Sequence, residues 1–309
     1  MKRIEPTWSW ARKYLQNRVA RIYPLYFILT LLTFLIFQLD SSYDFINLWS
    51  SYKPIDKLIV IILNLTFLRG FFSNYFFTGI SQGWSLTAEE TFYILAPLIF
   101  LTTKGNIKKV ILLSAFSLGI GIVLAKFFSS FSGPLRGFFG SEEFMFQWTY
   151  FGHSLEFAVG IALAYIISKW GEIKRKGSWS TYIGVVWIIA CAAFIATMET
   201  INAPIAPVHL KIITINFLLP PGIALLFYGL LSERTIFRHF LETKTLDLLG
   251  KSSYAFYLLH SGVLSVALLK LHVPTLLSLV ITTIISILVF KLIEEPLHKK
   301  LKSTAIARV

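Results

Sequence analysis

Long apolar stretches alternate with short polar or basic segments along the chain. A helix needs about 20 consecutive apolar residues to cross a bilayer, and eight of the stretches have about this length. We expect spanning helices over residues 22–39, 85–103, 107–127, 151–168, 181–198, 212–231, 246–269 and 275–292. The pattern therefore predicts an all-α fold, a polytopic membrane helix bundle.

A further apolar stretch, residues 58–72, is interrupted by Asn64, Arg69 and Gly70. Irregular or polar segments are tolerated at membrane depth only where protein covers them, so we expect an interfacial or re-entrant segment here. The stretch belongs to a predicted extracytoplasmic loop over residues 40–83. No loop is long enough for a soluble domain, and we therefore interpret residues 1–309 as a single membrane domain.

The basic residues are distributed unevenly between the predicted loops. The chain is 55% hydrophobic and contains 29 Lys and Arg against 16 Asp and Glu. Most of the basic residues fall in the two terminal segments and in every second loop, which places both termini in the cytoplasm by the positive-inside rule. They form no single patch with interleaved aromatic residues, so a nucleic-acid partner is not expected. The only cysteine, Cys191, lies in an apolar stretch and implies neither a disulfide nor a metal site.

Ionisable residues inside the predicted spans are candidates for function, because a charge within the bilayer is costly. Glu89 lies in the segment GWSLTAEETFYILAPLIF, one turn after Ser85 on the same predicted helix face. The alternative is that this helix begins at Thr91, which would leave both Glu89 and Glu90 among the lipid headgroups. In that case Glu89 would have no catalytic role.

Two histidines lie inside predicted spans, toward their outer ends. His260 ends the Tyr254–Tyr257–His260 series of the segment LGKSSYAFYLLHSGV, whose members are three residues apart. It could form a structural hydrogen bond between helices, or it could transfer protons or bind substrate, since histidine titrates near neutral pH. Glu156 is the third candidate acid, and it lies three residues after His153, with which it could simply pair.

Charged residues also flank the first and last spans on the predicted cytoplasmic side. Arg18 and Arg21 precede the first span, where they could anchor the helix or bind a phosphate-bearing ligand through their planar guanidinium groups. Glu294 and Glu295 close the last span beside Pro296. Acids are unfavourable at a helix C-terminus, so we expect a basic partner, and the two arginines lie on the same side of the membrane.

Five segments carry a family resemblance when they are taken together and in order. They are RVARIYPLYF, GWSLTAEETFYILAPL, EFAVGIALA, LGKSSYAFYLLHSGV and LIEEPL. In this order and spacing they resemble the acyltransferase-3 family, the integral-membrane O-acyltransferases that modify bacterial surface saccharides. The resemblance extends from about Arg18 to Pro296.

The resemblance implies a ten-span bundle in the bacterial inner membrane, of which about eight spans are present. It implies transfer of an acyl group, usually acetyl, from cytoplasmic acyl-CoA to a saccharide or glycolipid acceptor outside, among membrane lipids and with no metal. Arg18 and Arg21 match the family's R-x-x-R motif, Glu294 its terminal E-x-P motif, and Glu89 the acid of its WSL-x-x-E motif. We therefore assign donor binding to Arg18, Arg21 and Glu294, and we name Glu89, His260 and Glu156 as catalytic candidates.

The chain departs from the family pattern at its start. The family begins with two further spans, the first of which carries its presumed catalytic histidine, and this chain begins with the segment that follows them. We therefore expect an N-terminally incomplete chain rather than a natural short form, with Glu89 and His260 orienting the acceptor rather than acting as the main base. A catalytically inactive fragment or partner subunit is one alternative. A proton-coupled transporter or flippase is another, although no inverted repeat is visible.

Overall fold

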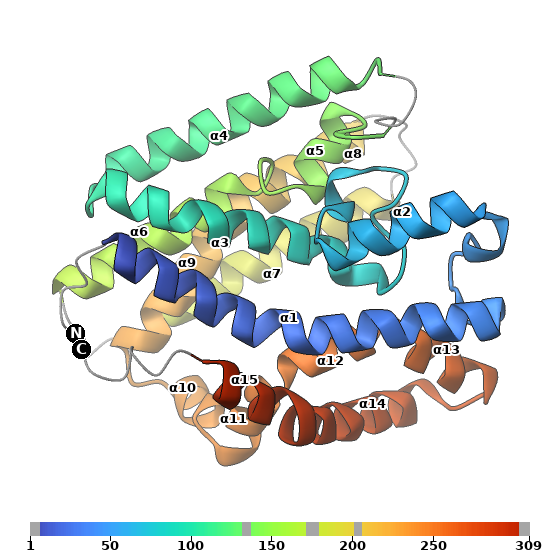
Figure 1. Cartoon of the computed structure of the whole chain (residues 1–309). Coiled ribbons are helices and arrows are strands. Elements are labelled where there is room, and N and C mark those ends of the chain that lie inside the picture. Colours follow the sequence, from blue (N-terminus) through green and yellow to red (C-terminus); the bar gives the residue numbers. More distant parts are fainter. Residues whose placement is uncertain (1–6, 132–136, 171–178, 201–205, 303–309) are drawn as a thin grey trace. The chain divides into compact units, whose positions relative to one another are not determined.

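The computed structural model describes residues 7–131, 137–170, 179–200 and 206–302, which are largely helical and contain no strand (Figure 1). The predicted all-α fold is therefore confirmed. The chain divides into two compact units. The terminal unit comprises Lys2–Pro97, Gly133–Phe138 and Lys244–Val309, and the middle unit comprises Leu98–Ser132 and Phe139–Thr243.

Five helices in the described residues are long and apolar enough to cross a membrane. They are α1 (Trp8–Leu39), α4 (Ile107–Phe128), the Trp179–Met198 part of α7 (Trp179–Thr200), the Val208–Ser232 helix and the Thr275–Leu301 helix. Two other predicted spans are also helical, α3 (Trp84–Thr103) and α6 (Ser154–Trp170). The chain is thus a membrane protein with helices at most of the positions that its apolar stretches predict.

The prediction of one continuous span over residues 246–269 was wrong. Three short helices occupy this region: α11 (Lys244–Lys251), α12 (Ser253–Leu259) and α13 (Val263–Lys270). Gly262 has an extended backbone, and the neighbouring Ser261 accepts a hydrogen bond at its carbonyl from the Ser81 hydroxyl at 2.7 Å. A contact from a distant segment therefore stabilises the break between α12 and α13.

The terminal unit is built around α1. It packs against α2 (Pro54–Leu65), α12 and α15 (Glu295–Leu301), and Figure 1 shows α2 beside it. The ring of Tyr26 on α1 stacks on Phe67 at 4.4 Å, and its hydroxyl donates to the Asn64 carbonyl near the end of α2. With 12 residues α2 is about 18 Å long, too short for a bilayer core of about 30 Å. Its membrane position stays a prediction.

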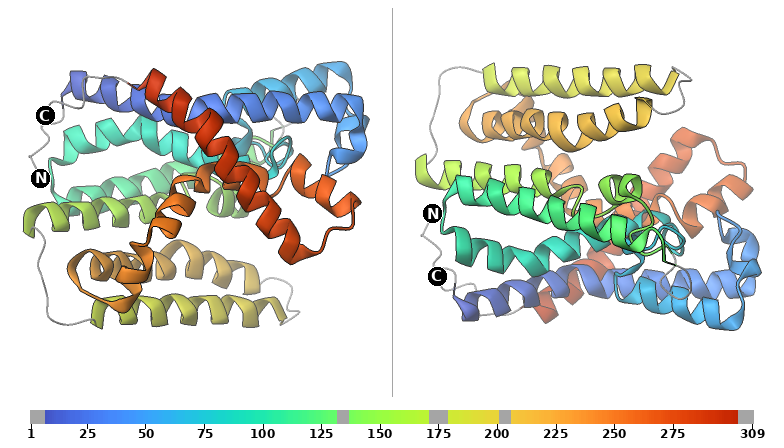
Figure 2. Two further views of the ribbon diagram at one scale, coloured as in Figure 1. Left: turned by 90° about the horizontal axis from the view of Figure 1, so that it is seen from below. Right: turned by 90° about the horizontal axis from the view of Figure 1, so that it is seen from above.

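The middle unit contains a close helix pair, α7 and α9 (Leu219–Ser232), which lie side by side in both views of Figure 2. The pair approaches closely at glycines: a Cβ on Gly229 would lie 2.4 Å from the Thr181 nitrogen. A π-helical turn, η5 (Thr214–Leu218), precedes α9. Proline at 220 has no N–H and would clash with the carbonyl four residues before it, which explains the wider turn.

Candidate functional site

Arg18 contacts two tyrosine rings of the terminal unit. The sequence predicts Arg18 and Arg21 just before the first span. Because α1 begins at Trp8, both residues lie within this helix. The Arg18 guanidinium carbon is 4.9 Å from the ring centre of Tyr93 on α3 and 5.3 Å from that of Tyr14 on α1. The two rings are nearly perpendicular, with centres 6.4 Å apart, so they approach the guanidinium from adjacent directions and position it by cation–π contacts. We call Tyr14, Arg18 and Tyr93 the aromatic clamp.

Glu89 is joined to this clamp along α3. The Tyr93 hydroxyl donates to Glu89 Oε2 at 3.3 Å, and the charges of Arg18 and Arg21 act on the same carboxyl group. Ser85 lies one turn before Glu89, so Ser85, Glu89 and Tyr93 follow one face of α3 over about 12 Å. Because α3 begins at Trp84, Glu89 and Glu90 both lie within the helix, so the alternative that it begins at Thr91 was wrong; Glu90 is only partly exposed.

The start of α3 is connected to α12 by hydrogen bonds. The Tyr257 hydroxyl donates to the Gln82 carbonyl at 2.7 Å and is also hydrogen-bonded to the Ser85 hydroxyl. The Gln82 side-chain amide in turn donates to the Tyr257 carbonyl. These bonds fix the end of α12, where His260 follows the last helical residue.

His260 is exposed at the end of α12, whereas the sequence predicts it inside a continuous span over residues 246–269. Its ring stacks on Phe256, and Nδ1 lies 2.9 Å from the Tyr257 carbonyl and 3.2 Å from the Phe256 carbonyl. The two carbonyls can only accept, so these contacts favour the tautomer with the proton on Nδ1, whereas the Gln82 side-chain nitrogen, 3.4 Å from Nδ1, would instead donate to it. In the first tautomer the lone pair lies on Nε2, as a general base requires.

Glu294 is buried beside α1, whereas its neighbour Glu295 faces outward. A π-helical turn, η6 (Phe290–Glu294), leads into Pro296 and turns the two acids in different directions. Glu295 pairs with Lys299 at 2.7 Å. Glu294 is 7% exposed, and its Oε2 has no hydrogen-bond partner among the described residues. The charge of Arg21 acts on Glu294 electrostatically without a direct ion pair in the described structure.

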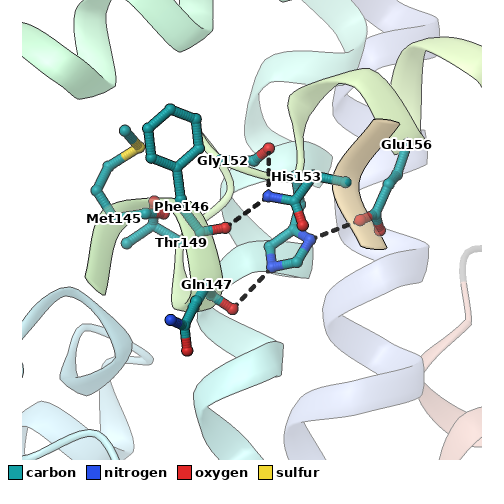
Figure 3. Close-up of polar contacts among 8 residues, drawn as sticks. Met145, Phe146, Gln147, Thr149, Gly152, His153 and Glu156 are labelled. Atoms are coloured by element: carbon teal, nitrogen blue, oxygen red, sulfur yellow. Dashed lines mark hydrogen bonds and ion pairs between the residues drawn. The ribbon is translucent and has the colours of Figure 1, made fainter. Parts of the chain in front are cut away.

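Glu156 lies in the middle unit and pairs with His153 (Figure 3). His153 Nδ1 is 2.7 Å from Glu156 Oε1, and Nε2 is 2.9 Å from the Gln147 carbonyl. The Asn216 side chain donates to the carbonyls of Phe146 and Gly152 and so fixes the same loop. Both nitrogens of His153 therefore face acceptors, and the ring has no lone pair to offer a substrate. Within the terminal unit, by contrast, the structure brings together Arg18 and Glu89.

An apolar groove of about 600 Å³ lies in the middle unit. It is lined by Trp179, Tyr182, Ile183, Val186, Trp187, Ala190, Cys191, Phe194, Thr214 and Leu218. It offers no acid, base or cation. Among the described residues, no group of three or more His, Cys, Asp or Glu side chains could hold a metal ion. The charged groups of the candidate site are thus those of the terminal unit.

Several residues of this site are not among those that the sequence pattern singles out. Tyr14 lies four residues before Arg18, a spacing that would have indicated a contact on one helix. The contact of Arg18 with Tyr93 joins residues from two distant helices, and nothing in the spacing of the sequence indicates it. The same holds for the hydrogen bonds of Gln82 and Ser85 with Tyr257.

Comparison with known proteins gives one match. The family model described as an acyltransferase domain, Acyl_transf_3, matches residues 7–294. Neither a curated protein nor a solved structure matches the chain significantly.

Proposed function

The chain belongs to the acyltransferase-3 family, and from this membership we propose that it transfers an acyl group from cytoplasmic acyl-CoA to an extracytoplasmic saccharide or glycolipid. The acyl group is acetyl in the simplest case, and the membrane is the bacterial inner membrane with both termini in the cytoplasm. The observation that carries this proposal is the series of contacts in the terminal unit that links Arg18 through Tyr93 to Glu89. These contacts connect the Arg18 guanidinium, which is suited to binding phosphate, with polar groups along α3.

The donor end of the proposed site is formed by the arginines of α1. Held by contacts with two tyrosine rings, Arg18 can direct N–H groups to a phosphate of CoA, which guanidinium binds in a bidentate manner. Arg21 is exposed one turn further along and is attracted to the buried Glu294. This attraction supports a role for Glu294 in holding Arg21 in place for the donor.

The acceptor end of the proposed site is the end of α12. In place of the orienting role expected from the sequence, we propose His260 as the base: its Nε2 accepts the proton of the acceptor hydroxyl while the hydroxyl oxygen forms a bond to the carbonyl carbon of the thioester. The carbonyl electron pair moves onto oxygen and then returns as the carbon–sulfur bond breaks. The CoA thiolate leaves and takes the proton back from His260, so that an ester and free CoA are formed. Glu89 and Ser85 lie on α3 between the donor end and the acceptor end of the proposed site. They can hydrogen-bond the polar groups of acyl-CoA between its phosphates and its thioester.

The test is transfer of labelled acetyl from acetyl-CoA to a surface saccharide in proteoliposomes that contain the purified full chain. Arg18→Gln should raise the KM for acetyl-CoA at least tenfold, because it removes the guanidinium group that binds the phosphate. Glu89→Gln should lower kcat/KM for acetyl-CoA at least tenfold, about 1.4 kcal/mol, because it weakens the hydrogen bonds to the donor. The matched control is Arg12→Gln, which removes an exposed charge from the same helix and should change neither constant. Equal effects of Arg12→Gln and Arg18→Gln would contradict the assignment of the donor site.

A further inference from the structure

Arg69 is a fully buried arginine that the proposed reaction does not yet use. It lies in the short turn η3 (Arg69–Phe71) of the terminal unit and is 0% exposed. Its Nη2 donates to the Ile80 carbonyl, but Nε and Nη1 have no hydrogen-bond partner among the described residues. Guanidinium does not lose its proton in proteins, so the charge is present wherever the side chain lies.

No described residue supplies a counter-charge to Arg69. The groups that act on it electrostatically are Tyr26 and Tyr257, and a tyrosine hydroxyl is neutral near pH 7. Their hydroxyl protons are already donated, by Tyr26 to Asn64 and by Tyr257 to Gln82. An uncompensated buried charge is among the most costly features that a folded chain can keep.

A second positive feature lies against the same guanidinium. A Cβ on Gly83 would come within 2.0 Å of Arg69 Nη2, so the arginine touches the residue that directly precedes α3. The N-terminus of a helix carries about half a positive charge, and the first turn of α3 contains no acidic residue. A helix N-terminus and an unpaired arginine in one buried place form an attractive position for an anion.

We infer that Arg69 and the start of α3 bind an anionic oxygen of the substrate. The inference rests on the proposed function. The oxygen is either the oxyanion that forms when the acceptor hydroxyl attacks the thioester carbonyl, or a fixed acidic group of the acceptor. In the first case the N–H groups of Arg69 stabilise the electron pair on oxygen until it returns and the carbon–sulfur bond breaks. Tyr257 connects this place to His260, since Arg69 acts on its hydroxyl and its carbonyl holds Nδ1 of His260.

The first experiment replaces Arg69 by methionine, a neutral side chain of similar length, in the full chain. Because an unpaired charge is removed, Arg69→Met should not lower the thermal unfolding midpoint in detergent. Transfer should nevertheless fall about 100- to 1,000-fold. A fall in kcat with an unchanged acceptor KM identifies the transient oxyanion, and a raised acceptor KM identifies a fixed acidic group. Arg238→Met, at a partly exposed arginine of the middle unit, is the control for losing a positive charge.

Two results would overturn the inference: a clearly lower unfolding midpoint for Arg69→Met, which would make Arg69 a structural support, or full transfer by that variant. A second measurement does not depend on transfer. Sulfate, compared with chloride at equal ionic strength, should raise the midpoint of the wild type more than that of Arg69→Met. If the wild type transfers nothing but sulfate protects it in this way, the proposed function fails and the anion site stands. Equal protection of both proteins would remove the site.

Discussion

We predict that the carboxylate of Glu233 stabilises the middle unit. Glu233 follows the last residue of α9, and its Oε1 accepts from the Ser180 N–H at 2.9 Å. Oε2 accepts from the Thr181 N–H at 3.0 Å and from the Thr181 hydroxyl at 2.6 Å. The residue is 2% exposed. A single buried carboxylate therefore accepts hydrogen bonds from two backbone N–H groups in the first turn of α7. Glu233→Gln tests the contribution of this carboxylate to the free energy of unfolding with almost no change in shape.

The expected magnitude follows from these three hydrogen bonds. Glutamine keeps one carbonyl oxygen but places an NH₂ group where the other oxygen accepts, so at least one buried N–H of α7 loses its acceptor. An unsatisfied buried polar group costs about 1–3 kcal/mol. The lost attraction between a negative charge and the helix N-terminus adds about 0.3–1 kcal/mol. Glu233→Gln should therefore reduce the free energy of unfolding by about 1–4 kcal/mol.

The pH dependence gives an independent check. Burial raises the pKa of Glu233, but the hydrogen bonds from Thr181 and Ser180 outweigh it and hold this pKa below the usual glutamate value. A depressed pKa means that the carboxylate contributes its full stability above the unfolded-state pKa of about 4.3. That contribution is lost as the pH falls through the lower pKa of the folded state. The difference between wild type and Glu233→Gln should thus be constant from neutral pH down to about pH 5 and should close in stronger acid.

The assay is denaturant unfolding of the purified proteins in mild detergent, followed by tryptophan fluorescence. The control is Glu242→Gln, because Glu242 is exposed and pairs with Arg238 at 2.8 Å only on the surface. This variant should leave the unfolding midpoint unchanged. If Glu233→Gln were as stable as Glu242→Gln, or if its difference from wild type persisted in strong acid, the carboxylate would not be the cap that the geometry indicates.

Three further predictions concern the base, the helix pair and the topology. His260→Gln should lower transfer about 100-fold or more by removing the base, whereas His153→Gln, whose ring nitrogens both face protein acceptors, should retain most transfer; equal loss in both would contradict the assignment. Gly229→Ala should reduce stability by about 1–3 kcal/mol, because the added Cβ meets the backbone of α7, whereas Gly160→Ala has open space and should be neutral in the same unfolding assay. Glu142→Cys should react with an impermeant maleimide added from outside intact cells, and labelling only after the membrane is opened would reverse the predicted orientation.

The sequence predicts the helices better than it predicts their interruptions. Apolar length alone locates helices such as α4 and α14 (Thr275–Val289), because burial in lipid requires a long run of apolar side chains. The break between α12 and α13 depends on Ser81, a residue far away in the sequence, and no local pattern encodes that contact. Each π-helical turn lies just before a proline, which we take as its cause. The proline is visible in the sequence, but the width of the turn depends on the packing around it.

The candidate site was predicted in its parts but not in its contacts. Glu89 could be singled out because a carboxylate inside an apolar stretch is costly, and its spacing to Tyr93 indicates a contact on one helix face. The contact of Arg18 with Tyr93 could not be predicted from the sequence, because it depends on how α1 and α3 lie next to each other. Arg69 was noticed only as an interruption of an apolar stretch, because complete burial of an arginine cannot be recognised from its neighbours in sequence.

Buried charges in this chain fall into two groups, and the difference separates structure from function. Glu233 is fully satisfied by hydrogen bonds from Ser180 and Thr181, as a charge that stabilises a fold must be. Arg69 and Glu294 each retain polar atoms without a partner in the described structure, although both are almost completely buried. Such groups weaken the fold, and proteins keep them chiefly where a ligand or a reaction uses them. Replacing Glu294 by Gln should therefore spare stability more than Glu233→Gln does while it weakens donor binding, and the opposite order would show that unsatisfied polar atoms do not mark function in this protein.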